Sequence, residues 1–199
     1  MTKAKTILGI SFAAAFVFSM VLIPAYAGGH LTIEKAKVDA TPTEIKKAKI
    51  DTTGKIPTKG GFVGYGIVTT GADIIVATTH AGVLDSELQK GDPMSPKWHN
   101  HYVTLGPSTG CTSGTEVLNI SYESPGKVKV KGDKIEIKGV PLGTAIPAHF
   151  GLAPNVATTF TTGTYDGFVA VFTISPSPVP NPVYGLTVCI DGLTTFAAP

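Results

Sequence analysis

The 199-residue chain contains no arginine, although it has 16 lysines and 14 acidic residues. Arginine supplies the planar, forked donor that matches phosphates and base edges, so a nucleic acid is not expected as a partner. Long apolar runs are also absent after residue 27. Because a membrane-spanning helix needs about 20 apolar residues, no membrane anchor is expected beyond that point.

Cysteine is scarce, and the two that occur, Cys111 and Cys189, lie 78 residues apart. A small, even number of cysteines in an exported chain favours one disulfide, which we predict between these two residues. The alternative is a pair of free thiols, as expected in a reducing compartment.

The N-terminus has the three parts of a cleavable secretory signal. Lys3 and Lys5 provide the positive start, residues 7–23 form the apolar run, and Ala25-Tyr26-Ala27 is a small-x-small cleavage site. We therefore expect residues 1–27 to be removed and the mature protein to be secreted, at the cell surface or in a pseudoperiplasm. An uncleaved anchor is the alternative, because 17 apolar residues are at the lower limit for spanning a bilayer.

Short segments rich in Val, Ile and Thr, separated by Gly and Pro, predict an all-β fold. The pattern is typical of a single antiparallel β-sandwich or small barrel of about eight to ten short strands over residues 61–199. A helix is conceivable only at residues 83–90. The strands are predicted at residues 62–69, 73–80, 98–105, 116–122, 127–138 (a hairpin turning at Gly132-Asp133), 156–162, 165–174 and 183–191.

Residues 28–60 form a lysine-rich segment with a two-copy repeat, in which residues 33–41 match residues 45–53. Two copies are too few for a repeat architecture. We interpret the segment as an exposed hairpin or a semi-ordered arm that precedes the β-domain. Its lysines predict a solvated charged face, with an acidic binding partner as the alternative.

Cleavage after Ala27 would create a terminal Gly28-Gly29-His30. An α-amine, two amide nitrogens and an imidazole can surround one square-planar ion, which suits Cu(II) or Ni(II). The three residues resemble the amino-terminal copper and nickel motif of several secreted proteins, and the resemblance depends on the cleavage point. A chance histidine near a frayed terminus is the alternative.

A second candidate metal site lies within the predicted β-domain. Strand alternation places His99 and His101 on one face with Val103, and His80 ends the preceding strand. If these strands pair as antiparallel neighbours, the three histidines converge, with Asp85 in the long connection nearby. Three histidines with an open position suit zinc or copper. The alternative is that they cap strand ends and donate hydrogen bonds to loop carbonyls.

Three segments resemble uncharacterised secreted β proteins of ammonia-oxidising archaea: ATTHAGVLDS at residues 77–86, WHNH at 98–101 and YESPGKVKV at 122–130. The resemblance covers about a quarter of the chain and implies an exported location. It also favours copper, because such organisms rely on copper enzymes. Separately, Asn119-Ile120-Ser121 matches the N-glycosylation acceptor pattern, which would require Asn119 to face solvent.

These patterns lead to one main functional hypothesis, a secreted β-sandwich protein that binds copper or zinc for metal capture, delivery or redox chemistry. The first alternative is a metal-free structural or interaction module that binds a protein partner at the cell surface. The second is a hydrolase that uses a three-histidine metal and a bound water. The sequence identifies no catalytic residue, so an enzymatic role stays open.

Overall fold

The computed structural model describes residues 29–58, 62–70, 73–79, 97–121, 124–143, 145–151, 159–176 and 187–199. Within these ranges the chain forms β-strands and one short 3-10 helix, η1 (Gly29–Leu31). No helix among the described residues is long and apolar enough to cross a membrane. The strands are β1 (Ile33–Thr41), β2 (Glu44–Thr52), β3 (Val63–Thr69), β4 (Asp73–Thr79), β5 (His99–Pro107), β6 (Thr115–Ser121), β7 (Lys127–Lys131), β8 (Lys134–Pro141), β9 (Ala145–Gly151), β10 (Thr159–Thr161), β11 (Tyr165–Pro176) and β12 (Val188–Ala197).

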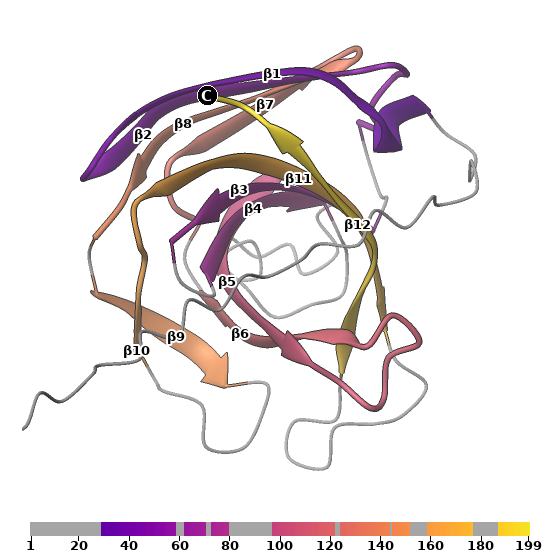
Figure 1. The fold of residues 1–199 in the computed structure, drawn as a ribbon, viewed down its shortest axis with the longest axis vertical. Helices are drawn as coiled ribbons and strands as arrows, with labels where there is room; N and C mark the ends of the chain where they lie inside the picture. Colours follow the sequence, from indigo (N-terminus) through magenta and orange to yellow (C-terminus); the bar gives the residue numbers. More distant parts are fainter. Residues whose placement is uncertain are drawn as a thin grey trace, which may run out of the picture.

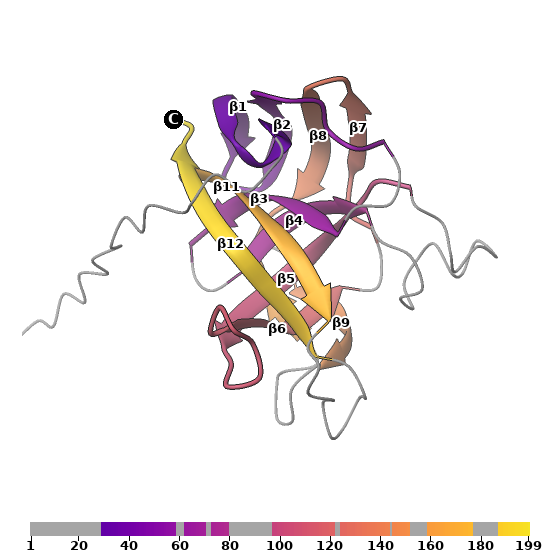
Figure 2. The ribbon, with the colours of Figure 1, turned by 90° about the vertical axis from the view of Figure 1, so that its right-hand side faces the viewer.

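The strands build two sheets, one of which closes into a barrel. The smaller sheet has the order β1-β2-β8-β7, and the larger has the order β10-β9-β6-β12-β11-β3-β4-β5. Because β5 also pairs with β6, six strands of the larger sheet return on themselves as an antiparallel barrel. Figure 1 shows the four-stranded sheet lying across one side of this barrel, and Figure 2 shows the same two layers from the side. The prediction of an all-β sandwich or barrel is confirmed.

The lysine-rich segment is part of this fold. Its two repeats are the paired strands β1 and β2, and β2 continues the sheet by pairing with β8. Val38, Ile45 and Ile50 from the segment belong to the same buried cluster as Ile135 and Ile137 of β8. The segment is therefore a hairpin, as one of the two interpretations held. It is not a separate arm, because its apolar side chains are buried in the same core as those of β8.

Two apolar cores stabilise the molecule. The first lies between the four-stranded sheet and the outer side of the barrel, where Tyr65, Ile75, Tyr102 and Val171 meet the inward face of the sheet. The second fills the barrel and is made of buried and partly buried residues from β3, β4, β5, β6, β11 and β12. Strand alternation explains both cores, since successive residues of β4 and β5 point in turn to the barrel interior and to the covering sheet.

The predicted elements agree with most of the observed ones. The hairpin at residues 127–138 turns at Gly132-Asp133 as expected, and Gly132 has the positive φ of 65° that a tight turn needs. Strand β9 was not predicted, because Pro147 and Gly151 lie within it. Strand β12 begins at Val188, and the possible helix at residues 83–90 lies outside the described residues.

Gly64 of β3 makes room for the largest side chain inside the barrel. A Cβ atom at this position would lie 2.3 Å from Cε2 and 2.5 Å from Cζ of Phe172 on the neighbouring strand β11. Such a contact cannot form without displacing the aromatic ring, which is itself buried. A strand glycine here thus reflects a close packing requirement.

We expect Gly64→Ala to lower the free energy of unfolding by about 1–3 kcal/mol, because overpacking a close-packed core forces a side chain or the backbone to move. Thermal or urea unfolding of four proteins measures it: wild type, Gly64→Ala, Phe172→Leu and the double variant. In the double variant the smaller leucine should relieve part of the clash, so the double variant should lose less stability than the sum of the two single losses. Additive effects in this cycle would show that Phe172 is not the residue that excludes a side chain at position 64.

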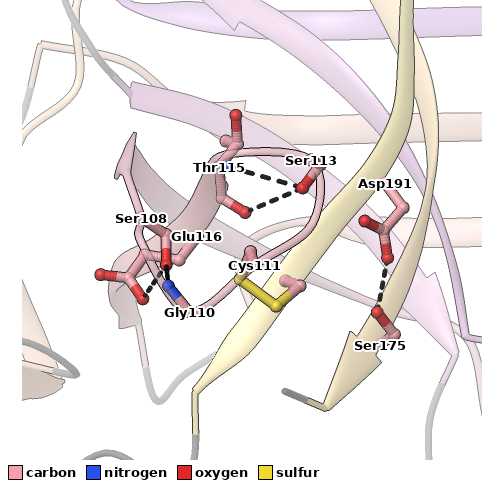
Figure 3. The surroundings of a disulfide bond; sticks show 9 residues. Ser108, Gly110, Cys111, Ser113, Thr115, Glu116, Ser175 and Asp191 are labelled. Atoms are coloured by element: carbon pink, nitrogen blue, oxygen red, sulfur yellow. Dashed lines mark hydrogen bonds between the residues drawn. A yellow bond between two sulfur atoms is a disulfide. The ribbon is translucent and has the colours of Figure 1, made fainter. Parts of the chain in front are cut away.

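The disulfide lies at the seam that closes the barrel. Cys111, in the loop between β5 and β6, is bonded to Cys189 on β12, as the sequence predicted. Strands β6 and β12 pair at only one position, Glu116 opposite Cys189. Figure 3 shows the bond beside Glu116, whose carboxylate accepts a hydrogen bond of 3.0 Å from Ser108 Oγ. The covalent bond therefore supports a seam that few backbone hydrogen bonds hold.

Candidate metal centre

His99 and His101 lie side by side inside one end of the barrel. They occupy alternate positions at the start of β5, on the face that continues with Val103, and are 3 % and 1 % exposed. Their ring centroids are 4.7 Å apart, and the ring planes meet at 88°. The shared, inward-looking face was predicted from alternation. The separation is compatible with two nitrogens on one ion, since each would sit about 2.0–2.1 Å from zinc.

A backbone carbonyl fixes the orientation of each imidazole. Nδ1 of His99 lies 2.8 Å from the carbonyl oxygen of Lys97, and Nδ1 of His101 lies 2.8 Å from that of Ser121. A carbonyl can only accept, so Nδ1 carries the proton in both rings. In the neutral tautomer Nε2 then has the lone pair. This is the arrangement found around metal-binding histidines, in which the second nitrogen donates to a carbonyl or carboxylate.

The end of β6 and the residues that follow it hold this part of β5 in place. Backbone N–H groups of Asn100 and Tyr102 donate to Ser124 Oγ and Ser121 Oγ, each at 3.0 Å. The Asn100 amide donates to the carbonyl of Pro125 at 2.8 Å. Regular pairing of β5 with β6 reaches only to Val103 and Ile120. Because serine hydroxyls satisfy these β5 amides, the Ser121 carbonyl can accept from His101.

One polar and one apolar residue of β4 lie opposite the two histidines. On β4, Thr78 lies opposite His99 and Val76 lies opposite His101. The Thr78 hydroxyl donates to the carbonyl of Val63 at 2.9 Å. Val76 belongs to the barrel core together with Phe172. An ion bound here would be shielded from bulk water on the side facing the barrel, which strengthens its interaction with donor atoms.

Two of the predicted ligands, His80 and Asp85, lie outside the described residues. The strand pairing from which they were predicted is confirmed over the described residues. Strands β4 and β5 are antiparallel neighbours, from Asp73 opposite Thr104 to Thr78 opposite His99. Among the residues that the structure describes, no three His, Cys, Asp or Glu side chains are grouped for metal binding. The three-histidine site therefore stays a prediction, with two of its members placed together.

The predicted terminal copper site is described in part, from Gly29 onward. Gly29 and His30 belong to η1, where the His30 carbonyl accepts a 2.7 Å bond from the Tyr65 hydroxyl. A Cβ at Gly29 would lie 2.8 Å from both Gly54 N and Thr53 Oγ1, so close packing alone requires glycine here. The glycine at position 29 is therefore explained by packing and does not by itself support a metal site.

If the terminal site forms, exported protein should show the visible absorption band of square-planar Cu(II) after one equivalent of copper is added. His30→Ala should abolish the band by removing the imidazole. Adding one residue before Gly28 should abolish it by displacing the α-amine, and this change leaves η1 untouched. Survival of the band in both variants would place the copper elsewhere.

Asn119 does not meet the condition for glycosylation. Its side chain is 1 % exposed, within β6, and its Oδ1 accepts a 2.9 Å hydrogen bond from the Ile120 amide. Strand β6 pairs with β5 on one edge and with β9 on the other, so the backbone of Asn119 lies within the sheet. In this fold Asn119 does not face solvent, as the acceptor prediction required.

Comparison of the chain with protein-family models, curated proteins and solved structures gave no match. The alternative prediction, that the histidines donate hydrogen bonds to carbonyls, agrees with the two observed bonds, but the sequence did not identify Lys97 and Ser121 as the acceptors. A histidine two residues after Lys97 could have suggested a bond within the strand end, but the Ser121 carbonyl reaches His101 only through the tertiary pairing of β5 with β6.

Proposed function

We propose that this protein binds one transition-metal ion, copper or zinc, through Nε2 of His99 and Nε2 of His101. The supporting observation is the shared geometry of the two rings, which are adjacent and buried and are both fixed by carbonyls that accept from Nδ1. Imidazole nitrogen suits both metals. His80, and Asp85 beside it in the sequence, are the proposed further ligands.

Capture, delivery or redox chemistry is the role that we propose for this ion. Two fixed imidazoles would supply part of the coordination shell, and the remaining positions would be open to further ligands or to a transfer partner. A hydrolase would in addition need an acid or base beside a metal-bound water. The sequence offers Asp85, Glu87 and Asp92 for that task, and all three lie outside the described residues.

We also propose that the protein acts after export. The signal-like N-terminus supports this, and the Cys111–Cys189 disulfide is compatible with an oxidising compartment. Copper and zinc are both bound outside cells as well as inside, so the location does not choose between them.

Metal analysis of exported protein tests the proposal. His30→Ala protein, which lacks the terminal site, should be secreted through its own signal and purified without chelator, with its N-terminus confirmed by mass spectrometry. It should contain close to one equivalent of copper or zinc. After chelation it should regain one equivalent, and cobalt(II) should give the visible absorption expected of a nitrogen-ligated site. Protein that is metal-free as isolated and takes up neither copper, zinc nor cobalt would leave the metal-free surface module as the better account.

A further inference from the structure

The outer face of the four-stranded sheet has a regular array of charge. Every second residue of each strand points away from the barrel, and three such positions on each of four strands align in register. Strands β7 and β8 contribute Lys127, Lys129, Lys131, Lys134 and Lys138. Strands β1 and β2 contribute Lys35, Lys37, Lys47 and Lys49. We call these nine lysines, with the three acids among them, the lysine face.

The three acids of the lysine face are Asp39, Asp51 and Glu136. Nine lysines against three carboxylates give the face a net charge of +6, although the whole chain carries only +2. The charge is therefore concentrated on one surface, and the rest of the chain is net negative. Charged residues that served only solubility would be spread over the surface with both signs mixed, and would not produce this asymmetry.

The acids neutralise only part of the array. Glu136 bridges Lys47 at 2.7 Å and Lys138 at 2.6 Å, and Asp51 pairs with Lys134 at 3.0 Å. Hydrogen bonds from Lys138 and Lys47 lower the pKa of Glu136 to about 2. Within the described residues, the other six lysines of the face make no ion pair. Their ammonium groups are available to an anionic partner.

The register also places like charges directly opposite one another. Lys138 lies between Lys47 and Lys127, and two further lysine pairs face each other, Lys37 with Lys49 and Lys134 with Lys131. Directly opposed like charges destabilise a sheet. Protection of the sheet edges explains lysines on β1 and β7. It does not explain those on the central strands β2 and β8.

We propose that the lysine face binds an acidic polysaccharide, a linear chain of carboxylated or sulfated sugars. Neighbouring lysines are spaced about 4.8 Å across strands and about 6.8 Å along them, which forms parallel tracks for a chain of repeated anions. The array offers no aromatic ring for stacking bases, no arginine fork and no apolar side chain for inserting into lipid. A partner recognised by charge alone, outside the cell, fits these properties.

The probe is polygalacturonate or dextran sulfate, with neutral dextran as the blank. Titration calorimetry on the exported protein measures binding. Both acidic polymers should bind and neutral dextran should not, and binding should weaken steeply as salt rises. Lys129→Gln/Lys131→Gln should reduce affinity about 25-fold, because each lysine near a dense anionic surface contributes roughly five-fold. Circular dichroism checks that the variants fold.

The matched control is Lys129→Arg/Lys131→Arg, which keeps both positive charges at the same two positions of the array. It should change affinity by less than about two-fold, because the proposed binding depends on charge. Equal losses in both double variants, or no binding to either acidic polymer, would overturn the proposal. So would tighter binding to a single-stranded oligonucleotide or to anionic vesicles, or a dimer in sedimentation equilibrium that Lys129→Gln/Lys131→Gln dissociates, because each identifies another occupant.

Discussion

Replacing both cysteines by alanine should lower the free energy of unfolding by about 4.5 kcal/mol, the value that the chain-entropy model gives for a loop of this length. The cross-link joins residues 78 apart in sequence. It also lies where the barrel closes, beside the single residue pair of β6 and β12. Loss of the bond should therefore act on the native seam as well as on the unfolded chain. Urea unfolding of Cys111→Ala/Cys189→Ala against wild type measures the loss.

Hydrogen exchange separates the two contributions. If the bond supports the seam, amides of β6 and β12 should exchange faster in the double variant under native conditions, while amides of β1, β2 and β8 keep their protection. Wild type in a mild reductant should behave like the variant. A loss below about 1 kcal/mol, with unchanged exchange at the seam, would mean that the barrel closes without help from the disulfide.

The second large effect concerns metal affinity. Asparagine places an amide donor near the position of Nδ1 but has no atom at Nε2, so His101→Asn can keep the bond to the Ser121 carbonyl while it removes the ligand. We expect His99→Asn/His101→Asn to reduce zinc or copper affinity by at least about 100-fold, since removal of outer-shell partners alone costs 10–100-fold. Titration against a competing chelator measures the loss.

The control measurement is the free energy of unfolding of wild type and both double variants in the absence of metal. If the histidines serve only as hydrogen-bond donors, the asparagine variant should be near wild type, whereas His99→Ala/His101→Ala should lose about 1–3 kcal/mol for each unsatisfied carbonyl. The metal hypothesis adds a separate expectation, that zinc raises the melting temperature of wild type but of neither variant. Equal stabilisation of all three proteins by zinc would exclude the pair as ligands.

Local patterns in the sequence were sufficient to predict most of the strands and to place His99 and His101 on one face. The period of two fixed His99, His101 and Val103 on one side, and the Gly132-Asp133 turn fixed the hairpin of β7 and β8. Strand β9 was not anticipated, because its proline and glycine are poor strand formers. The burial of Asn119 was not foreseen either, because no pattern in the sequence indicates that β6 is paired on both edges.

The lysine face shows most clearly what the sequence could not provide. Residues 33–53 and 127–138 each have alternating lysines, but only the pairing of β2 with β8 joins them into one surface. That pairing connects residues about 90 positions apart, such as Lys47 and Lys138. In the same way, the carbonyl of Ser121 becomes the acceptor for His101 through a tertiary contact across 20 residues. Long-range pairing follows from packing as a whole and leaves no local signal.

The central claim is that Nε2 of His99 and Nε2 of His101 bind one metal ion while Nδ1 of each ring stays protonated. Long-range ¹H–¹⁵N NMR spectra of the imidazoles, recorded during a zinc titration, test it most directly. Before zinc, both rings should show the Nδ1–H tautomer that the Lys97 and Ser121 carbonyls impose. With one equivalent, both Nε2 resonances should move together and both Nδ1–H signals should remain. An Nε2–H tautomer in the metal-free protein, or zinc-induced shifts confined to His30, would contradict the claim.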